Sequence, residues 1–119
     1  MAGLAWVRLD SGIARNHKML ALLDMKDGYR HVTVYVFGLG YCGEQGTDGF
    51  IPRNALPFIH ARPVDAVKLV EVGLWHLDPG GWLVNDWREY QPSNEETERR
   101  STKARTAAAA RWAKERAKT

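Results

Sequence analysis

The strongest constraint on the fold is the stretch GLWHLDPGGWLVNDW, between residues 73 and 87, which can fold back on itself around a tight turn. In the DPGG tetrapeptide, proline stands second and glycine third, an arrangement typical of a β-turn. Folding at this turn sets Leu77 opposite Trp82 and Trp75 opposite Val84, an apolar cross-strand pairing that stabilises a hairpin. The stretch therefore predicts a β-hairpin with an apolar face that the rest of the chain must cover.

Three segments before the hairpin have the composition and spacing of short helices. Apolar side chains at i, i+3 and i+4 predict a first amphipathic helix over residues 16–25. After a very short strand at 50–51, residues 52–60 form a helical element interrupted at Pro57, and residues 63–72 form a better helix that opens on a proline. The last two elements, joined by a few residues, resemble a helix-turn-helix.

Residues 31–43, HVTVYVFGLGYCG, are open to more than one interpretation. Their β-branched composition favours a strand, and the run contains a G-x-G-x-x-G, which can present backbone N–H groups to a phosphate. A phosphate loop needs a helix that begins at the third glycine, but the following EQGTDGFIP is interrupted by two glycines and a proline. We therefore expect a buried helix, in which Gly38, Gly40 and Gly43 let neighbouring backbone approach closely.

The sequence has no arrangement of residues that is typical of an enzyme or a metal site. Cys42 is the single cysteine, so an internal disulfide is excluded, and we expect a small buried apolar residue rather than a nucleophile. The histidines are too widely spaced for an i, i+3 or i, i+4 pair of metal ligands: His17, His31, His60 and His76. We expect no catalytic residue, no metal and no cofactor.

The expected location follows from hydropathy. No apolar run is long enough to cross a bilayer, and MAGLAWVRLD lacks the basic and apolar regions of a secretory signal. We therefore expect a cytoplasmic protein without a membrane partner.

The formal net charge of +3 is unevenly distributed along the 119 residues. Residues 1–93 hold 9 Lys and Arg against 10 Asp and Glu, whereas residues 94–119 hold 8 against 4. The S-x-x-E capping box that begins at Ser93 and the alanines at 107–110 predict a helix in this basic segment. At 100° per residue, most of its cations fall within an arc of about 120°: Arg99, Arg100, Lys103, Arg111, Lys114 and Lys118.

An arc of cations on one helix face predicts contact with the phosphates of a nucleic acid. In the preceding body, the candidates for DNA contact are Arg53, Asn54, Arg62 and Lys68. The outer face of helix 63–72 is close to neutral and lacks the Arg, Asn or Gln side chains that read base edges; it carries Val64, Asp65, Lys68 and Glu71. Base-specific readout by this helix is therefore less well supported than phosphate contact.

Three short motifs, TDGFIP, LVEVGLW and GGWLVNDW, precede the basic segment in this order. With the surrounding pattern of residues 6–92, they resemble the N-terminal winged-helix domain of phage replisome-organiser and DnaD-type replication-initiation proteins, encoded by phages and prophages of actinobacteria. The resemblance implies an α+β, mainly α fold: a winged helix-turn-helix with a small β-hairpin wing over residues 1–92, then a long basic C-terminal helix over 93–119. In that family the segment YVFGLGYCGEQGTDG is a helix that leads to the first strand.

The resemblance also implies a function. A phage-encoded DNA-binding protein is expected, acting in replication initiation or transcription regulation in the cytoplasm of a bacterial host. Duplex DNA is favoured over single-stranded DNA as the partner, a replication or host protein is a further partner, and a homodimer is allowed. The alternative hypothesis is a winged-helix module whose near-neutral recognition surface and Trp-rich wing bind a host or phage protein, with the tail only a solvated extension.

Overall fold

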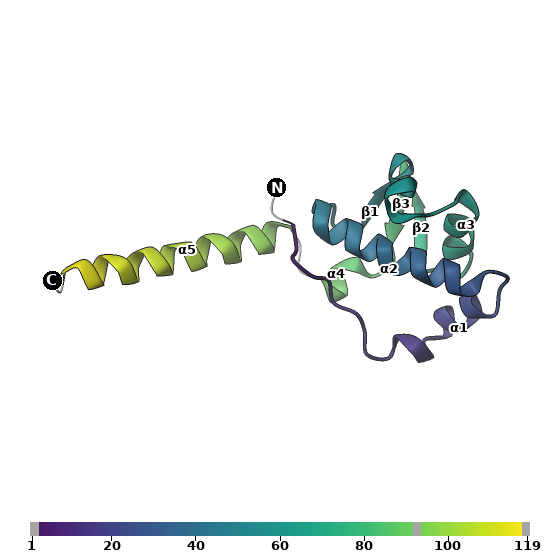
Figure 1. Ribbon diagram of the computed structural model, residues 1–119, viewed down its shortest axis with the longest axis horizontal. Coiled ribbons are helices and arrows are strands. Elements are labelled where there is room, and N and C mark those ends of the chain that lie inside the picture. The colour runs from purple at the N-terminus through teal and green to yellow at the C-terminus, as the bar shows by residue number, and fades with distance from the viewer. Residues whose placement is uncertain (1–2, 92–93, 118–119) are drawn as a thin grey trace.

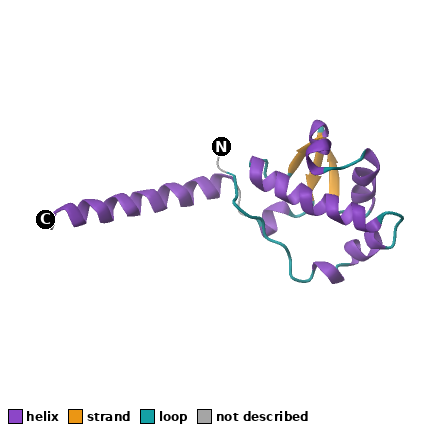
Figure 2. Cartoon of the chain, in the orientation of Figure 1, coloured by secondary structure: helices purple, strands orange, loops and turns teal. Residues whose placement is uncertain are grey.

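The structure, a computed structural model, describes residues 3–91 and 94–117; within 94–117, side chains are described at 99, 103 and 105–114. The fold is α+β and mainly helical, as predicted, with a small three-stranded antiparallel sheet (Figures 1 and 2). Its elements are η1 (Ile13–Arg15), α1 (His17–Leu23), α2 (Gly28–Gln45), β1 (Phe50–Pro52), η2 (Arg53–Ile59), α3 (Pro63–Glu71), β2 (Trp75–Asp78), β3 (Gly81–Val84), α4 (Trp87–Tyr90) and α5 (Asn94–Ala117).

The sheet has the strand order β1-β3-β2, and the predicted hairpin forms with the predicted register. Trp75 pairs with Val84, and Leu77 pairs with Trp82. The two tryptophans are buried with their ring centroids 5.7 Å apart, whereas Leu77 stays 68% exposed. The tryptophans of the hairpin therefore belong to the core, and contact between the wing and a partner protein stays a prediction.

Residues 31–43 are helical, and α2 extends beyond them at both ends. A Cβ on Gly38 would lie 3.1 Å from Trp75 and 3.2 Å from Ile51, and a Cβ on Gly43 would meet Val7. At Gly40, in contrast, a Cβ would meet no atom within 4 Å. Close packing thus explains Gly38, which lies against side chains, and Gly43, whose carbonyl oxygen also accepts a hydrogen bond from the Leu4 backbone N–H (2.8 Å), whereas the expectation for Gly40 is wrong.

The core lies where α2 crosses the sheet between α1, η2 and α3 (Figure 1). Leu22, Ile51, Ile59, Leu69 and Trp75 are almost completely buried and come from five different elements. Burial of large apolar side chains is the main contribution that stabilises so small a sheet, because three short strands hold few hydrogen bonds of their own.

The end of the body is fixed to the N-terminal segment through Gln91. The Arg8 backbone N–H donates to Gln91 Oε1 (2.8 Å), and Gln91 Nε2 donates to the Arg8 carbonyl oxygen (2.7 Å). The Arg8 guanidinium also donates to the carbonyl oxygen of Tyr90. Three residues later, α5 begins at Asn94 and extends away from the body (Figure 1). The predicted capping residue Ser93 and the domain boundary placed at residue 92 lie outside the described residues.

Candidate nucleic-acid interface

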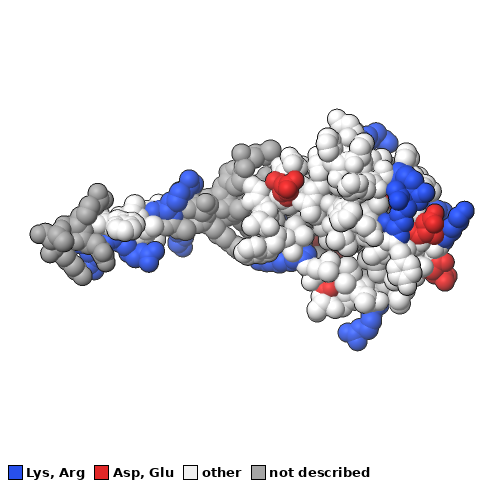
Figure 3. Space-filling model, in the orientation of Figure 1, with Lys and Arg blue, Asp and Glu red and all other residues white. Residues whose placement is uncertain are grey.

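Helix α5 carries a row of solvent-exposed cations. Its described Lys and Arg side chains are all exposed: Arg99, Lys103, Arg105, Arg111 and Lys114. At 100° per residue, four of these fall within an arc of about 120°, whereas Arg105 lies on the opposite side of the helix. Lys and Arg are visible along α5 in Figure 3. The Arg100 side chain and the whole of Lys118, which were predicted to complete the arc, lie outside the described part of the chain.

The sequence of α5 explains why it can be a helix without a body to pack on. Ala107–Ala110 have the highest helix propensity, and the segment lacks the apolar stripe that a helix packed on a core requires. Trp112 is 67% exposed. The charged side chains described on this helix are all exposed to solvent.

Two of the body candidates, Arg53 and Asn54, lie together at the start of η2 and are exposed. The Arg53 guanidinium carbon lies 5.2 Å from the ring centroid of Trp82, a cation–π contact that orients the side chain beside the hairpin. The Arg53 backbone N–H donates to the carbonyl oxygen of Gly80 in the hairpin turn (3.0 Å). Both positions thus remain open to a phosphate.

The other two body candidates are engaged by carboxylates. Arg62 lies 3.5 Å from Asp27 and 3.5 Å from Asp65, and Lys68 Nζ lies 3.1 Å from Glu71. Each of these cations has a carboxylate neighbour that offsets part of its charge. The structure therefore does not bring the predicted contact residues to one surface: α3 and α5 lie at opposite ends of the molecule (Figure 1).

Asp65, expected on the outer face of helix 63–72, is instead completely buried. Its Oδ1 accepts a hydrogen bond from His31 Nδ1 (2.7 Å), and its Oδ2 accepts one from the backbone N–H of Arg62 (2.7 Å). Arg30 Nε lies 3.4 Å from the same Oδ2. An acidic side chain at the third position of a helix that starts with proline can reach back to the N-cap, and this signal in RPVD was available in the sequence.

The pKa of the Asp65 carboxyl reflects this environment. Burial raises its pKa, but the hydrogen bonds from the Arg62 backbone and from His31, together with the Arg62 and Arg30 guanidinium groups, lower it by more. The pKa therefore lies below the ordinary value of 3.8. The cluster joins the start of α2 to the start of α3 and has the character of a structural ion-pair network.

Cys42 and the potential metal ligands are the remaining candidates for chemistry among the described residues. Burial raises the pKa of the Cys42 thiol to about 11, which leaves almost no thiolate at neutral pH. Within residues 3–91 and 94–117, no group of three or more His, Cys, Asp or Glu side chains is placed to hold a metal ion.

No helix among the described residues combines the length and the apolar character needed to cross a membrane. Comparison of the chain with protein-family models, with curated proteins and with solved structures finds no match. The residues and geometry described above are therefore the basis on which a function is assigned.

Proposed function

We infer that this chain is a small DNA-binding protein in which α5 binds the phosphate backbone of DNA and the body is a winged helix. The observation that carries this inference is the set of exposed cations on α5, which extends from a body whose Arg62 and Lys68 already contact carboxylates. Each Lys or Arg that neutralises a phosphate releases counterions, so a row of cations on one face is an efficient phosphate-binding surface.

The order of elements supports the winged-helix assignment. Helix α2 is followed by β1, then by the helical pair η2 and α3, and then by the β2–β3 hairpin. Strand β1 adds to β3 on the side away from β2, so the hairpin extends from the sheet as a wing would. In such an arrangement α3 is the recognition helix of the helix-turn-helix, and residues 78–81 form the tip of the wing.

The side chains of α3 indicate how the DNA would be bound. Val64 and Val67 are 43% and 59% exposed on its outer face, beside the paired Lys68 and Glu71. The two valines cannot hydrogen-bond to base edges, and the Lys68 ammonium, which could contact a guanine, is paired with Glu71. Affinity would come chiefly from α5 and Arg53, so binding would be strongly salt-dependent and weakly sequence-dependent.

The resemblance to phage replication-initiation proteins suggests the biological setting. On this proposal the protein acts in replication initiation or transcription regulation in a bacterial host, and its DNA is duplex. A continuous helix with cations on one side fits the regular phosphate spacing of a duplex better than the irregular path of a single strand.

The experiment that tests the proposal compares two triple variants of the full chain. Lys103→Ala, Arg111→Ala and Lys114→Ala remove cations from the arc, and we expect a loss of affinity for duplex DNA of mixed sequence by at least about tenfold at low salt. The matched control removes the same charge from exposed positions of the body: Arg15→Ala, Lys26→Ala and Arg88→Ala. Equal effects of the two triples would contradict the assignment of α5 as the binding element.

A second candidate function is supported by the exposed Val64 and Val67. Apolar side chains at the centre of a neutral helix face suit a protein partner better than a DNA groove. If the full chain binds neither duplex nor single-stranded DNA, this protein-interaction function becomes the better account.

A further inference from the structure

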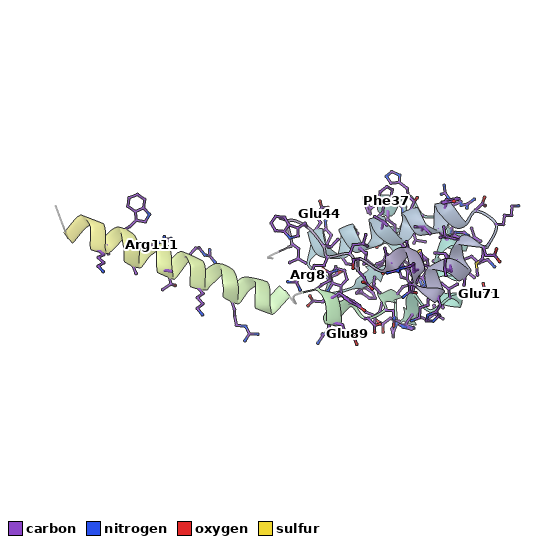
Figure 4. All side chains as sticks on the ribbon, turned by 90° about the horizontal axis from the view of Figure 1, so that it is seen from below. Arg8, Phe37, Glu44, Glu71, Glu89 and Arg111 are labelled. Atoms are coloured by element: carbon purple, nitrogen blue, oxygen red, sulfur yellow. The ribbon has the colours of Figure 1, made fainter. Side chains whose placement is uncertain are left out.

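An apolar groove with a volume of about 980 Å³ runs along the outer side of α2. Helix α2 contributes Val36, Phe37 and Gly40, the N-terminal segment contributes Trp6, and η2 contributes Phe58. Trp6 and Phe58 are 81% and 76% exposed, and Val36 and Phe37 are almost half exposed. Figure 4 shows Phe37 and Glu44 projecting on the same side of the body. Contiguous exposed apolar side chains of this kind mark an interaction surface.

Gly40 makes the groove deeper at its centre. A Cβ at this position would meet no atom within 4 Å, so a large side chain from another helix can lie directly against the α2 backbone there. Glycine in a helix interior costs about 1 kcal/mol relative to alanine. Because nothing within the body packs against Gly40, a contact with another molecule explains why a glycine stands at this position.

Helix α5 has a complementary feature. Trp112 is 67% exposed, and Ala108 and Ala109 precede it by one helical turn. On the helix, Trp112 lies about 100° or more from every described member of the basic arc. The small alanines allow close approach of α5 to another surface, and the indole is a large aromatic anchor of the type that dominates protein interfaces.

Charge also favours this pairing. Glu44 is the one Lys, Arg, Asp or Glu side chain among the described residues that line the groove. Arg105, two turns before Trp112, projects from nearly the same side of α5 and is exposed. The groove therefore carries one carboxylate, and this side of α5 carries a cation. Their opposite charges favour association of the two surfaces.

We propose that α5 of one copy docks through Trp112 and its neighbouring alanines into the α2 groove of a second copy, forming a symmetric dimer. Trp112 lies 18 residues beyond Asn94, or about 27 Å along the helix, and α5 extends away from its own body (Figure 1). In this arrangement Trp112 does not lie on the groove of its own body. A second copy can be reached by an unbroken helix.

Two-fold symmetry makes the contact twice, with each copy giving one helix and one groove. A stable interface of at least about 1,200 Å² then requires only about 600 Å² from each contact. Lys103, Arg111 and Lys114 lie about 100° or more around the helix from Trp112, so they stay exposed in such a dimer. The dimer would therefore present two phosphate-binding helices, although the docking itself does not depend on DNA binding.

The test measures the dissociation constant of the dimer that the full chain forms after nucleic acid has been removed. Sedimentation is followed in a dilution series that starts at about 100 µM, well above a dissociation constant in the micromolar range. Trp112→Ala and Gly40→Leu should each raise it by at least about 30-fold, the usual loss for an interface anchor. Both positions are suited to substitution, because Trp112 is exposed and a Cβ at residue 40 meets no atom within 4 Å. The control Leu77→Ala removes a side chain that is 68% exposed on the hairpin and should leave the constant unchanged.

Mixing the two variants tests the pairing itself. Gly40→Leu keeps an intact Trp112, and Trp112→Ala keeps an intact groove, so a mixed dimer regains one of the two contacts. We expect it to be tighter than the dimer of either variant alone. A natural chain that is monomeric at the highest concentration, a dimer that survives both substitutions, or a mixture no tighter than its components would each overturn the proposal. DNA binding by Trp112→Ala separates this result from the proposed function, because that variant keeps the basic arc.

Discussion

His31 and Asp65, 34 residues apart in the sequence, form a buried hydrogen bond of 2.7 Å between Nδ1 and Oδ1. His31 is 2% exposed and Asp65 is completely buried. The bond joins α2 to α3 and therefore fixes the helix proposed for recognition against the helix that crosses the sheet. A polar contact of this kind constrains orientation more tightly than apolar packing, since a hydrogen bond is directional.

Removal of the Asp65 carboxylate should be strongly destabilising. In Asp65→Ala, His31 and the Arg62 backbone N–H lose a buried acceptor, and we expect the free energy of unfolding to fall by about 3 kcal/mol. Urea unfolding followed by circular dichroism measures this change. The control is Glu71→Ala, which removes an exposed ion pair with Lys68 and should cost less than about 1 kcal/mol. Equal losses in the two variants would contradict the structural role of the buried pair.

The same carboxyl predicts a dependence of stability on acid pH. Because the pKa of Asp65 is lower in the folded chain than its ordinary value of 3.8, its contribution to stability is complete above pH 3.8. It is lost as the pH falls through the lower, folded-state pKa. The difference in unfolding free energy between the natural chain and Asp65→Asn should therefore shrink as the pH falls below about 3.8. A difference that grows on acidification would have the wrong sign.

Gly38 and Gly40, two residues apart on α2, should respond to alanine in opposite ways. At residue 40 the added methyl meets no atom within 4 Å, so better helix propensity should raise the free energy of unfolding by about 1 kcal/mol. At residue 38 it lies 3.1 Å from the buried Trp75, and the strain should lower that free energy by about 1 kcal/mol despite the gain in propensity. Chemical denaturation of both variants checks the signs, and stabilisation by both would show that the core has room at Gly38.

Cys42 should be protected from thiol reagents in the native chain. Its side chain is completely buried, burial raises its pKa to about 11, and the thiol donates to the carbonyl oxygen of Phe50 (3.6 Å). We expect reaction with an aromatic disulfide reagent at pH 8 to occur only as the chain opens, and to become fast in denaturing urea. Rapid reaction without denaturant would mean that α2 does not cover this thiol.

The sequence predicts those parts of the fold whose signals are local. The turn between Trp75 and Trp82 fixes the hairpin register, and the helices around residues 16–25 and 63–72 follow from apolar spacing. The glycines and the proline that follow residues 31–43 exclude a phosphate-binding loop there. This exclusion allows the assignment of residues 31–43 to a helix. Their propensity favours a strand, and the burial that overrides it involves side chains far away in the sequence.

The candidate site was less predictable, because charge counts do not reveal neighbours. Arg62 and Lys68 have the charge for phosphate contact, but Asp27, Asp65 and Glu71 lie beside them in the fold. Asp65 looked exposed from helical spacing, yet its position at the start of α3 turns it inward to the backbone. The groove along α2 could not be foreseen at all, since three separate segments form it.

The proposed function depends most on the basic arc of α5, and the salt dependence of DNA binding tests the role of this arc directly. The logarithm of the association constant of the natural chain for duplex DNA should fall linearly with the logarithm of the salt concentration. If Lys103, Arg111 and Lys114 each neutralise one phosphate, replacing all three by alanine should make the slope shallower by about 2.7. A slope that is the same in both proteins, or no binding by the natural chain at low salt, would contradict the proposed function.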